Sequence, residues 1–299
     1  MRPAAPLATP SRSPRLGLPD LGCGVGLRVP HYTHLFSQRP RVDFFEIVSE
    51  NFLVEGGPPR DNLERALGLA PVVQHGVALG IGSTTPLDFD YLARLKALAR
   101  RTGTPWLTDH LSWTRAAGAE LHDLLPLPCT EEAVRYVAER TRLVQDFLEL
   151  RVGLENPSSY VTFRANTMPE WEFLAAIADE ADCGILLDVN NVHVSAKNQG
   201  FDPRRYLDGL PHHRVVQLHL AGHTDKGTHL LDTHSAEVSE PVWALYRYAL
   251  ERVGRVSTLV EWDDALPAFD VVWDEAKKAA AIAEEVFGGA GPRAEPPTP

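Results

Sequence analysis

Six short apolar segments of this sequence end in a histidine or a carboxylate, the residue types that hold catalytic metal ions. They are PVVQ before His75, PWLTD before His110, RVGL before Glu155, GILL before Asp188, VVQL before His219 and STLV before Glu261. Histidine and carboxylate ligands without cysteine suit iron, manganese or zinc, and they exclude a thiolate-rich structural site. The pattern therefore predicts a metal centre.

Three further candidates lie in segments that follow the strands. Asn191 comes after Asp188, and LLDTHS supplies Asp232 and His234, whose spacing of two residues places both side chains on one side of an extended loop. Together these are too many ligands for one ion with a coordination number of about four to six. Two or three ions bridged by a carboxylate would use them all, and either Glu155 or Asp188 could bridge.

Each candidate also has an ordinary structural explanation. A single histidine at a strand end is more often hydrogen-bonded within the fold than bound to metal. An acid such as Asp188 can cap the following helix, and Asn191 can form an Asx-turn. Independent caps would not favour histidine, however, so the recurrence at six strand ends favours a metal centre.

The remaining histidines are assigned to solvated loops and helix edges, with two exceptions. His193 could replace Asn191 as a ligand, and His122, in LHDLLPLP, is left undecided. The histidines expected to be solvated are His31, His34, His212, His213, His223 and His229.

The segments that carry the candidates alternate with amphipathic helical patterns. Eight apolar runs occur, at residues 22–28, 42–48, 71–77, 105–112, 151–157, 183–191, 214–222 and 256–263. Strands alternating with helices are typical of a parallel sheet, and eight such units match the α/β fold of the single-domain (β/α)8 TIM-type barrel, which is about 250 residues long. The carboxyl ends of barrel strands converge on one rim, so the candidate ligands would meet there. A doubly wound open sheet is the competing fold, but no GxGxxG or P-loop follows any strand.

Capping residues mark the ends of several predicted helices. LDFDYLARLKALARRTG ends on Gly103, Thr130 precedes two acids at the start of TEEAVRYVAERTRLVQDFLEL, and SEPVWALYRYALERVG runs from Ser239 to Gly254. FDVVWDEAKKAAAIAEEVFGG forms the last helical pattern.

Composition limits the partners and the compartment. The formal net charge of −11 argues against nucleic acid. No apolar run of about 18 residues occurs, and the first twenty residues lack the apolar region of a secretory signal. Cys23, Cys129 and Cys183 are far apart, which predicts free thiols and a cytoplasmic protein. Residues 1–19 and 288–299 are expected to be flexible, disordered tails around one domain at 20–287.

Several long motifs resemble those of a known family, the multinuclear non-haem iron-dependent oxidative enzymes, which include the methanobactin-biosynthesis oxidase. The likeness runs from about Gly22 to Phe287 and rests on GVGLRVPHY, FFEIVSENF, QHGVALGIGS, TDHLSW, LHDLLPLP, LENPSSY, LLDVNNVHVSAKNQGFDP, QLHLAGH, DTHS and VEWDD. His193 sits where relatives often carry tyrosine, which makes it a pocket residue rather than a family ligand. The positions that match the family's iron ligands are His75, His110, Glu155, Asp188, Asn191, His219, Asp232, His234 and Glu261.

The resemblance implies oxidative modification of a ribosomally synthesised precursor peptide, at a cysteine, with an oxazolone and thioamide, a thiooxazole or a related product. The implied cofactor is two or three iron ions of mixed Fe(II)/Fe(III) state, with O2 as the co-substrate. A small partner protein that recognises the leader of the precursor is also implied.

Other functions stay open on the residues alone. The same ligands could hold three zinc ions and activate water in a metal-dependent phosphodiesterase, although the sequence has no basic stripe to bind DNA. A metal-binding or peptide-binding scaffold without activity is opposed by the presence of every expected ligand. A sugar isomerase lacks a convincing lysine at a strand end, because Lys197 lies in the SAKNQG loop.

Overall fold

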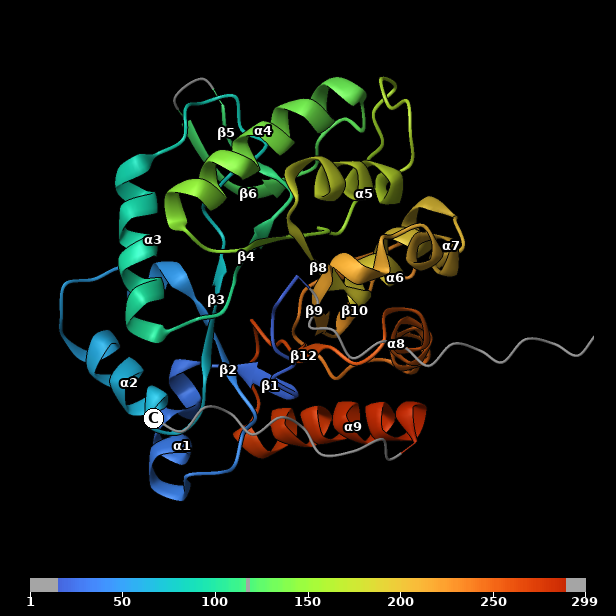
Figure 1. The fold of residues 1–299 in the computed structure, drawn as a ribbon. Coiled ribbons are helices and arrows are strands. Elements are labelled where there is room, and N and C mark those ends of the chain that lie inside the picture. The colour runs from blue at the N-terminus through green and yellow to red at the C-terminus, as the bar shows by residue number, and fades with distance from the viewer. Residues whose placement is uncertain (1–15, 117–118, 289–299) are drawn as a thin grey trace, which may run out of the picture.

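Eight short parallel strands close into a barrel, and helices surround it on the outside (Figure 1). The computed structural model describes residues 16–116 and 119–288, so the tails expected at 1–19 and 288–299 lie mostly outside the described residues. In the order in which they neighbour one another, the barrel strands are β1 (Cys23–Gly26), β12 (Ser257–Val260), β9 (Val215–Leu220), β8 (Gly184–Asp188), β7 (Val152–Glu155), β4 (Leu107–His110), β3 (Val72–Gly76) and β2 (Phe45–Val48). The predicted α/β barrel is confirmed, and each strand lies within one of the eight apolar runs.

The helices follow the strands in sequence, as the alternating pattern predicts. They are α1 (Tyr32–Gln38), α2 (Pro58–Leu67), α3 (Phe89–Thr102), α4 (Glu131–Leu148), α5 (Glu170–Ala181), α6 (Val189–Gln199), α7 (Pro203–Asp208), α8 (Glu240–Val253) and α9 (Phe269–Phe287). Short 3-10 turns cover Val29–His31, Ser49–Phe52 and His212–Arg214. In the described part of the chain, no helix has the length and apolar character needed to cross a membrane.

Most of the predicted caps form, and one does not. The Thr130 hydroxyl accepts a hydrogen bond from the backbone N–H of Ala133 at 3.2 Å, and Gly103 ends α3 with a φ of 64°. Ser239 occupies the N-cap position of α8, but its side chain makes no capping hydrogen bond. The prediction of the helix boundary at Ser239 is therefore confirmed, but the predicted capping hydrogen bond from its side chain is wrong.

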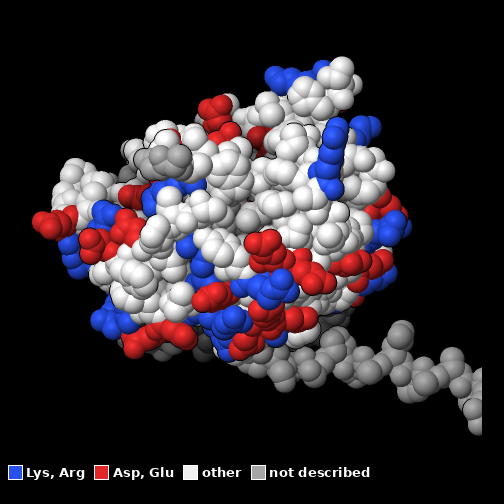
Figure 2. Space-filling view, turned by 90° about the horizontal axis from the view of Figure 1, so that it is seen from above, with Lys and Arg blue, Asp and Glu red and all other residues white. Residues whose placement is uncertain are grey.

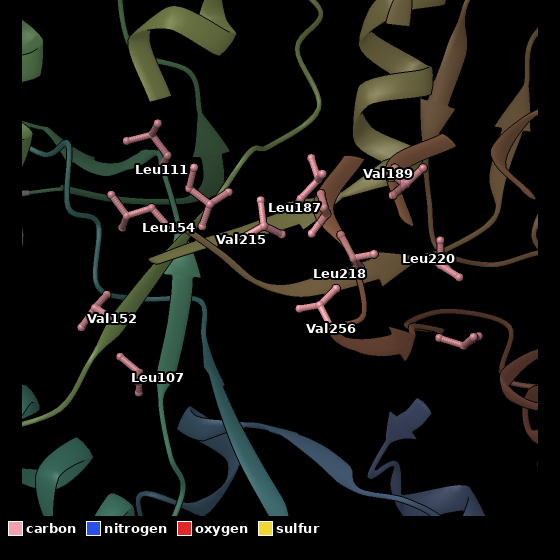
Figure 3. Packing of buried hydrophobic residues seen from close by; sticks show 14 of the residues in the cluster. Leu107, Leu111, Val152, Leu154, Leu187, Val189, Val215, Leu218, Leu220 and Val256 are labelled. Atoms are coloured by element: carbon pink, nitrogen blue, oxygen red, sulfur yellow. The ribbon is translucent and has the colours of Figure 1, made fainter. Parts of the chain in front are cut away.

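Side chains alternate along each strand between the face that packs against the helices and the face that points into the barrel. Leu154, Leu187 and Leu218 belong to the core between the strands and the helices, and Figure 3 shows them among the packed side chains of that core. The next residue on β7 and β8 is Glu155 and Asp188 respectively. Because side chains alternate across a strand, these carboxylates point into the barrel.

The interior of the barrel changes from apolar to polar along its axis. A small cluster of Phe44, Val73, Trp106 and Leu259 is separate from the main core. The Trp106 indole N–H donates to Gln217 Oε1 at 2.7 Å, and Gln217 lies two residues before His219 on β9. The apolar cluster around Trp106 therefore packs below the polar residue Gln217, which lies next to the candidate ligand His219.

Two hairpins that the sequence did not predict extend the rim. They are β5 (Trp113–Ala116) with β6 (Ala119–Leu125), and β10 (His223–Asp225) with β11 (Leu230–Asp232). The second hairpin follows Gly222, where an added Cβ would overlap the carbonyl oxygen of Ala236. Glycine at this position lets the chain that carries Asp232 and His234 fold back against β9.

Candidate metal centre

The structure brings side chains from seven barrel strands or their ends, and from the segment at the end of one rim hairpin, to a single place. Strand pairing sets part of this arrangement, because His110 is the register partner of Glu155 and Asp188 is the register partner of His219. Within the described residues, four overlapping triads have potential ligand atoms within 4.8 Å of one another. They are His75–His110–Glu155, Glu155–Asp188–His219, Asp188–His234–Glu261 and Glu46–His219–Glu261.

The first triad consists of two histidines that face one carboxylate oxygen. His75 Nε2 and His110 Nε2 each lie 3.4 Å from Glu155 Oε2. The other ring nitrogen of His75 is 2.9 Å from the Thr108 hydroxyl, which fixes the ring so that Nε2 points at Glu155. Outer hydrogen bonds of this kind are typical of histidines that bind metal.

Glu155 connects the first triad to the second. Its Oε1 lies 3.9 Å from His219 Nδ1, whereas its Oε2 faces His75 and His110. A carboxylate with one oxygen in each of two ligand groups has the geometry that a bridging ligand needs.

Asp188 divides its two oxygens between a structural role and the centre. Oδ1 accepts a hydrogen bond from the Asn191 backbone N–H at 2.6 Å and caps α6. Oδ2 lies 3.9 Å from His234 Nε2 and makes no hydrogen bond to any residue that the structure describes. The helix-cap explanation of Asp188 is therefore correct for one oxygen and leaves the other for the centre.

Asn191 lies in the first turn of α6 with its carbonyl oxygen free. Its Nδ2 donates to the backbone oxygen of Asn156 at 3.1 Å, and its buried Oδ1 has no hydrogen-bond partner in the described part of the protein. This orientation presents an oxygen ligand and not an N–H donor.

The third triad is assembled partly by the rim hairpin. His234, with a φ of 46°, places Nε2 at 2.8 Å from Asp232 Oδ1 and Nδ1 at 3.2 Å from Glu261 Oε2. Non-glycine residues seldom adopt positive φ, and such strain is concentrated at functional sites. Asp232 and His234 do lie side by side, as their spacing of two residues predicts.

Glu46 of β2 is a member of the cluster that the sequence analysis missed. Its Oε1 lies 3.1 Å from His219 Nε2, and its Oε2 accepts a hydrogen bond from Gln217 Nε2 at 2.5 Å. Glu46 thus holds the outer nitrogen of His219, which leaves Nδ1 directed at Glu155 and Glu261. The available signal was a glutamate inside the apolar run VDFFEIV, where an unpaired charge would be costly.

Burial and mutual repulsion alter the proton affinities of these groups. Burial lowers the pKa of His110 to about 4 and, with repulsion from His110 and His219, holds the pKa of His75 well below its ordinary value. Burial raises the pKa of Asp188 to about 7 and that of Glu155 well above its usual range. Without metal, burial therefore favours the uncharged forms of both imidazoles and of the Glu155 carboxyl.

The opposite holds around Glu261. Burial disfavours the charged forms of His219, His234 and Glu261. Even so, Glu46 and Glu261 raise the pKa of His219 well above its ordinary value, and Asp232 raises the pKa of His234 in the same direction. In return His219 and His234 hold the pKa of Glu261 well below its usual range. Without metal, the charged forms of His219, His234 and Glu261 therefore stabilise one another.

Several buried polar atoms at the centre make no hydrogen bond, which is the feature that a metal would explain. Buried polar groups in proteins nearly always have partners, and unpartnered ones cost about 1–3 kcal/mol each. The clearest cases are three oxygens able to coordinate a metal, Glu155 Oε2, Asp188 Oδ2 and Asn191 Oδ1. His219 Nδ1 and His234 Nε2 instead face carboxylate oxygens of Glu261 and Asp232, at 3.0 and 2.8 Å. The residues present therefore fit a group of two or three cations.

The other histidines lie outside the triads, and one expectation about them is wrong. His31 is buried, with Nε2 at 2.9 Å from the Pro267 oxygen and its ring against Phe269, so it is not solvated. His223 is half-buried, and its Nδ1 lies 2.8 Å from Asn190 Oδ1. The ring of His193 packs 5.1 Å from that of His223, and His122 is exposed on β6.

Replacing Glu46 with glutamine is expected to weaken metal binding by about 10- to 100-fold without unfolding the barrel. The amide can still contact Gln217, but it no longer stabilises the His219 tautomer that presents Nδ1, and loss of such outer partners typically has effects of this size. Metal affinity would be measured by titration against a competing chelator.

The matched control for this change is Glu275→Gln. Glu275 is a half-buried carboxylate on α9 that accepts a hydrogen bond from Val238 N–H, away from the centre. Equal affinities for the Glu46→Gln protein and the control would show that Glu46 has only a packing role.

The sequence matches a described family over most of its length. A family model with the description "RiPP precursor modification enzyme MbnB/TglH/ChrH" matches residues 22–284. A UPF0276 protein of Anaeromyxobacter sp. (strain Fw109-5) is 53% identical over 262 residues, which cover 88% of this chain and 93% of that protein. A UPF0276 protein of Caulobacter vibrioides (strain NA1000 / CB15N) is 48% identical, covering 87% and 93% of the two chains.

Solved structures share the barrel at low sequence identity. D-allulose 3-epimerase from Methylomonas sp., in complex with D-allulose, has a TM-score of 0.53 at 14% identity, covering 91% of this chain and 98% of that chain. An IOLI protein with a bound zinc atom has a TM-score of 0.54 at 13% identity, covering 88% and 96%. At these identities the likeness shows the fold alone.

Proposed function

The chain belongs to the family of RiPP precursor modification enzymes described as MbnB/TglH/ChrH, and from this premise we propose that it is an iron- and O2-dependent oxidase of a ribosomally synthesised precursor peptide. The residue modified is a cysteine of that peptide, and the product is an oxazolone with a thioamide, a thiooxazole or a related ring. The observation that carries the proposal is the set of overlapping ligand triads joined by Glu155 and Asp188.

The ligand chemistry supports iron. Imidazole and carboxylate ligands without thiolate suit iron and leave the metal free to take a soft sulfur ligand from a substrate. Bound iron would supply the redox chemistry with O2, as cofactors do in such enzymes. The residues that would hold it are His75, His110, Glu155, Asp188, Asn191, His219, Asp232, His234 and Glu261.

The chain's own contribution is to hold and release protons and to keep the ligands in place. In the metal-free centre the pKa values of Glu155, Asp188, His219 and His234 are all raised, so the fold favours their protonated forms. Cations that bind to these ligands displace the protons, so metal binding should release protons from the buried centre. Arg28, which lies 3.4 Å from Glu261 Oε1 and 2.5 Å from Asp263 Oδ1, holds the last strand end in place from outside.

A small protein that recognises the leader of the precursor is part of the proposal. The family acts on precursor peptides, and exposed apolar side chains at the rim, Tyr160, Val161 and Phe163, give such chains a surface to contact. Exposed apolar groups of this kind are common where other chains dock.

The test is to purify the protein, measure iron by elemental analysis, and incubate it with the Cys-bearing precursor encoded beside its gene and any adjacent small protein. Under O2 the expected result is a defined change in peptide mass that is absent under anaerobic conditions. An unchanged mass with iron loaded and the partner present would contradict the proposal.

A metal-dependent phosphodiesterase is the alternative outcome of the same preparation. On the face shown in Figure 2, basic and acidic side chains are interspersed and no continuous basic stripe is visible. Cleavage of abasic DNA by the zinc-loaded protein, with no O2-dependent change in the peptide, would favour hydrolysis over oxidation.

A further inference from the structure

A separate cavity of about 220 Å³ lies beside the candidate metal centre. It is formed by the segment between β6 and α4, the long segment between β7 and α5, the start of α5, and the segment from α6 to α7. Since a cavity of about 150 Å³ can hold a benzene ring, this one has room for a long amino-acid side chain. Its volume therefore suits part of a peptide substrate.

The cavity and the metal centre share a wall. Leu111 and Asn156 line the cavity, and they directly follow the candidate ligands His110 and Glu155. The Asn156 side chain is fixed by two hydrogen bonds of 3.0 Å with the backbone of Asp188. A peptide residue held in the cavity would therefore neighbour a residue held at the metals.

Aromatic rings form much of the cavity wall. Trp171, Phe201 and Tyr206 contact one another, with ring centroids 5.7 to 6.3 Å apart. At the rim, Val161 and Phe163 also line the cavity, and Val161 is 57% exposed. Apolar side chains left in solvent at a cavity entrance favour an entrance that another chain covers.

One acid stands among these rings. Glu170 is the only charged residue among those that line the cavity, and no lysine, arginine or histidine is among them. Its Oε1 accepts a hydrogen bond from the buried Tyr206 hydroxyl at 2.8 Å, and no hydrogen bond to Oε2 occurs in the described residues. Burial raises the pKa of Glu170 to about 7, which is a cost to the fold.

Helix capping does not account for this cost. An acid in the first turn of α5 would favour the helix dipole, but exposed Glu172 in the same turn already supplies one. A carboxylate that lines the same cavity as Trp171, Phe201 and Tyr206 can bind an ammonium or guanidinium group, through charge pairing and cation–π attraction.

We propose that this cavity binds a cationic side chain, lysine or arginine, of the precursor peptide, next to the residue that is modified at the metal centre. The link to the precursor rests on the proposed function, whereas the preference for a cation rests on Glu170 and the rings alone. The cavity then selects the substrate by a residue that takes no part in the chemistry.

The test uses the metal-free full chain and two probes, Nα-acetyl-lysine N-methylamide and its neutral analogue Nα-acetyl-norleucine N-methylamide. Dissociation constants would come from NMR titrations that follow the tryptophan indole signals, since Trp171 lines the cavity. We expect the lysine probe to bind about tenfold more tightly than the norleucine probe. Equal or tighter binding of the norleucine probe would overturn the proposal, and this comparison needs no variant.

Glu170→Gln and Glu172→Gln form a matched pair on the first turn of α5. Glu170→Gln should remove the preference for the lysine probe, while Glu172→Gln, at an exposed position outside the cavity, should keep it. Equal losses in both variants would point to a long-range effect of charge and overturn the site. Because neither metal nor turnover is measured, failure of this test leaves the oxidase proposal intact, and failure of the oxidase leaves the cation site intact.

Discussion

Replacing Glu155 with alanine is expected to abolish modification of the precursor peptide and to remove most of the bound metal. Glu155 is the residue whose two oxygens face different ligand groups, Oε2 toward His75 and His110 and Oε1 toward His219. Its loss therefore disconnects two triads at once, whereas loss of a terminal ligand removes one contact. Elemental analysis of iron and the mass of the peptide after incubation under O2 measure the two effects.

The stability of the isosteric variant Glu155→Gln separates a metal role from a structural one. If Glu155 were a structural ion-pair partner, removing its charge would destabilise the metal-free protein by about 3–5 kcal/mol. Burial, however, raises the pKa of this carboxyl well above its usual range and so disfavours its charge, and the amide should therefore leave the unfolding temperature of the metal-free protein unchanged or higher.

Metal should stabilise the wild-type protein and the variant to different extents. A ligand at about 1,000 times its Kd adds about 4 kcal/mol to the free energy of unfolding, and Glu155→Gln should lose most of that gain. The control Glu275→Gln, a half-buried carboxylate on α9, should keep it. A large loss of stability in the metal-free Glu155→Gln protein would show that the cluster is structural.

The barrel, and the approach of candidate ligands that are distant in the sequence, could be predicted because both follow from the regular alternation of strand and helix patterns. Asp188 and His219 end separate apolar runs, and in a closed parallel sheet such ends lie at one rim and here pair in register. Rim segments have no such periodicity. The β10–β11 hairpin depends on the space that Gly222 leaves for the backbone of Ala236, which no local pattern reveals.

Residues that act through another residue were harder to predict. Glu46 lies in the middle of its apolar run and not at the end, so a search for polar strand ends passes over it. His31 is buried because Pro267 and Phe269, more than 200 residues away, happen to enclose it. Glu170 was hidden for a similar reason, since its cavity needs four segments that are distant in the sequence.

Metal affinity is expected to fall steeply as the pH is lowered from 8 to 6. A cation must displace the proton of Asp188, whose pKa is about 7, and the protons of Glu155, His219 and His234, whose pKa values are raised well above the ordinary range. Each displaced proton changes the apparent affinity by about tenfold per pH unit below the pKa of its group.

The triads should respond differently. His75 and His110 are neutral across this range because their pKa values are lowered, so in the first triad only Glu155 gives up a proton. The triad of Asp188, His234 and Glu261 gives up two, from Asp188 and His234. Metal content, measured after equilibration with a competing chelator, should therefore decline in steps as the pH falls. The triad of Asp188, His234 and Glu261 should lose its ion before the triad of His75, His110 and Glu155. A single loss below pH 5 would contradict this assignment.

The stability of the metal-free protein should fall as the pH rises, whereas metal affinity should increase. Asp188, Glu155, His219 and His234 all have raised pKa values in the fold, so they bind more protons folded than unfolded, and their contribution to stability is lost as the pH rises through those values. The Asp188 contribution is lost between about pH 4 and 7, whereas those of Glu155, His219 and His234 continue to fall above about pH 6.5. The metal-free unfolding temperature should thus fall as the pH is raised above about 6.5, where that of the loaded protein rises. The gap between the two temperatures must widen with pH if cations and protons compete for the same atoms, and a constant gap would mean that metal binds elsewhere.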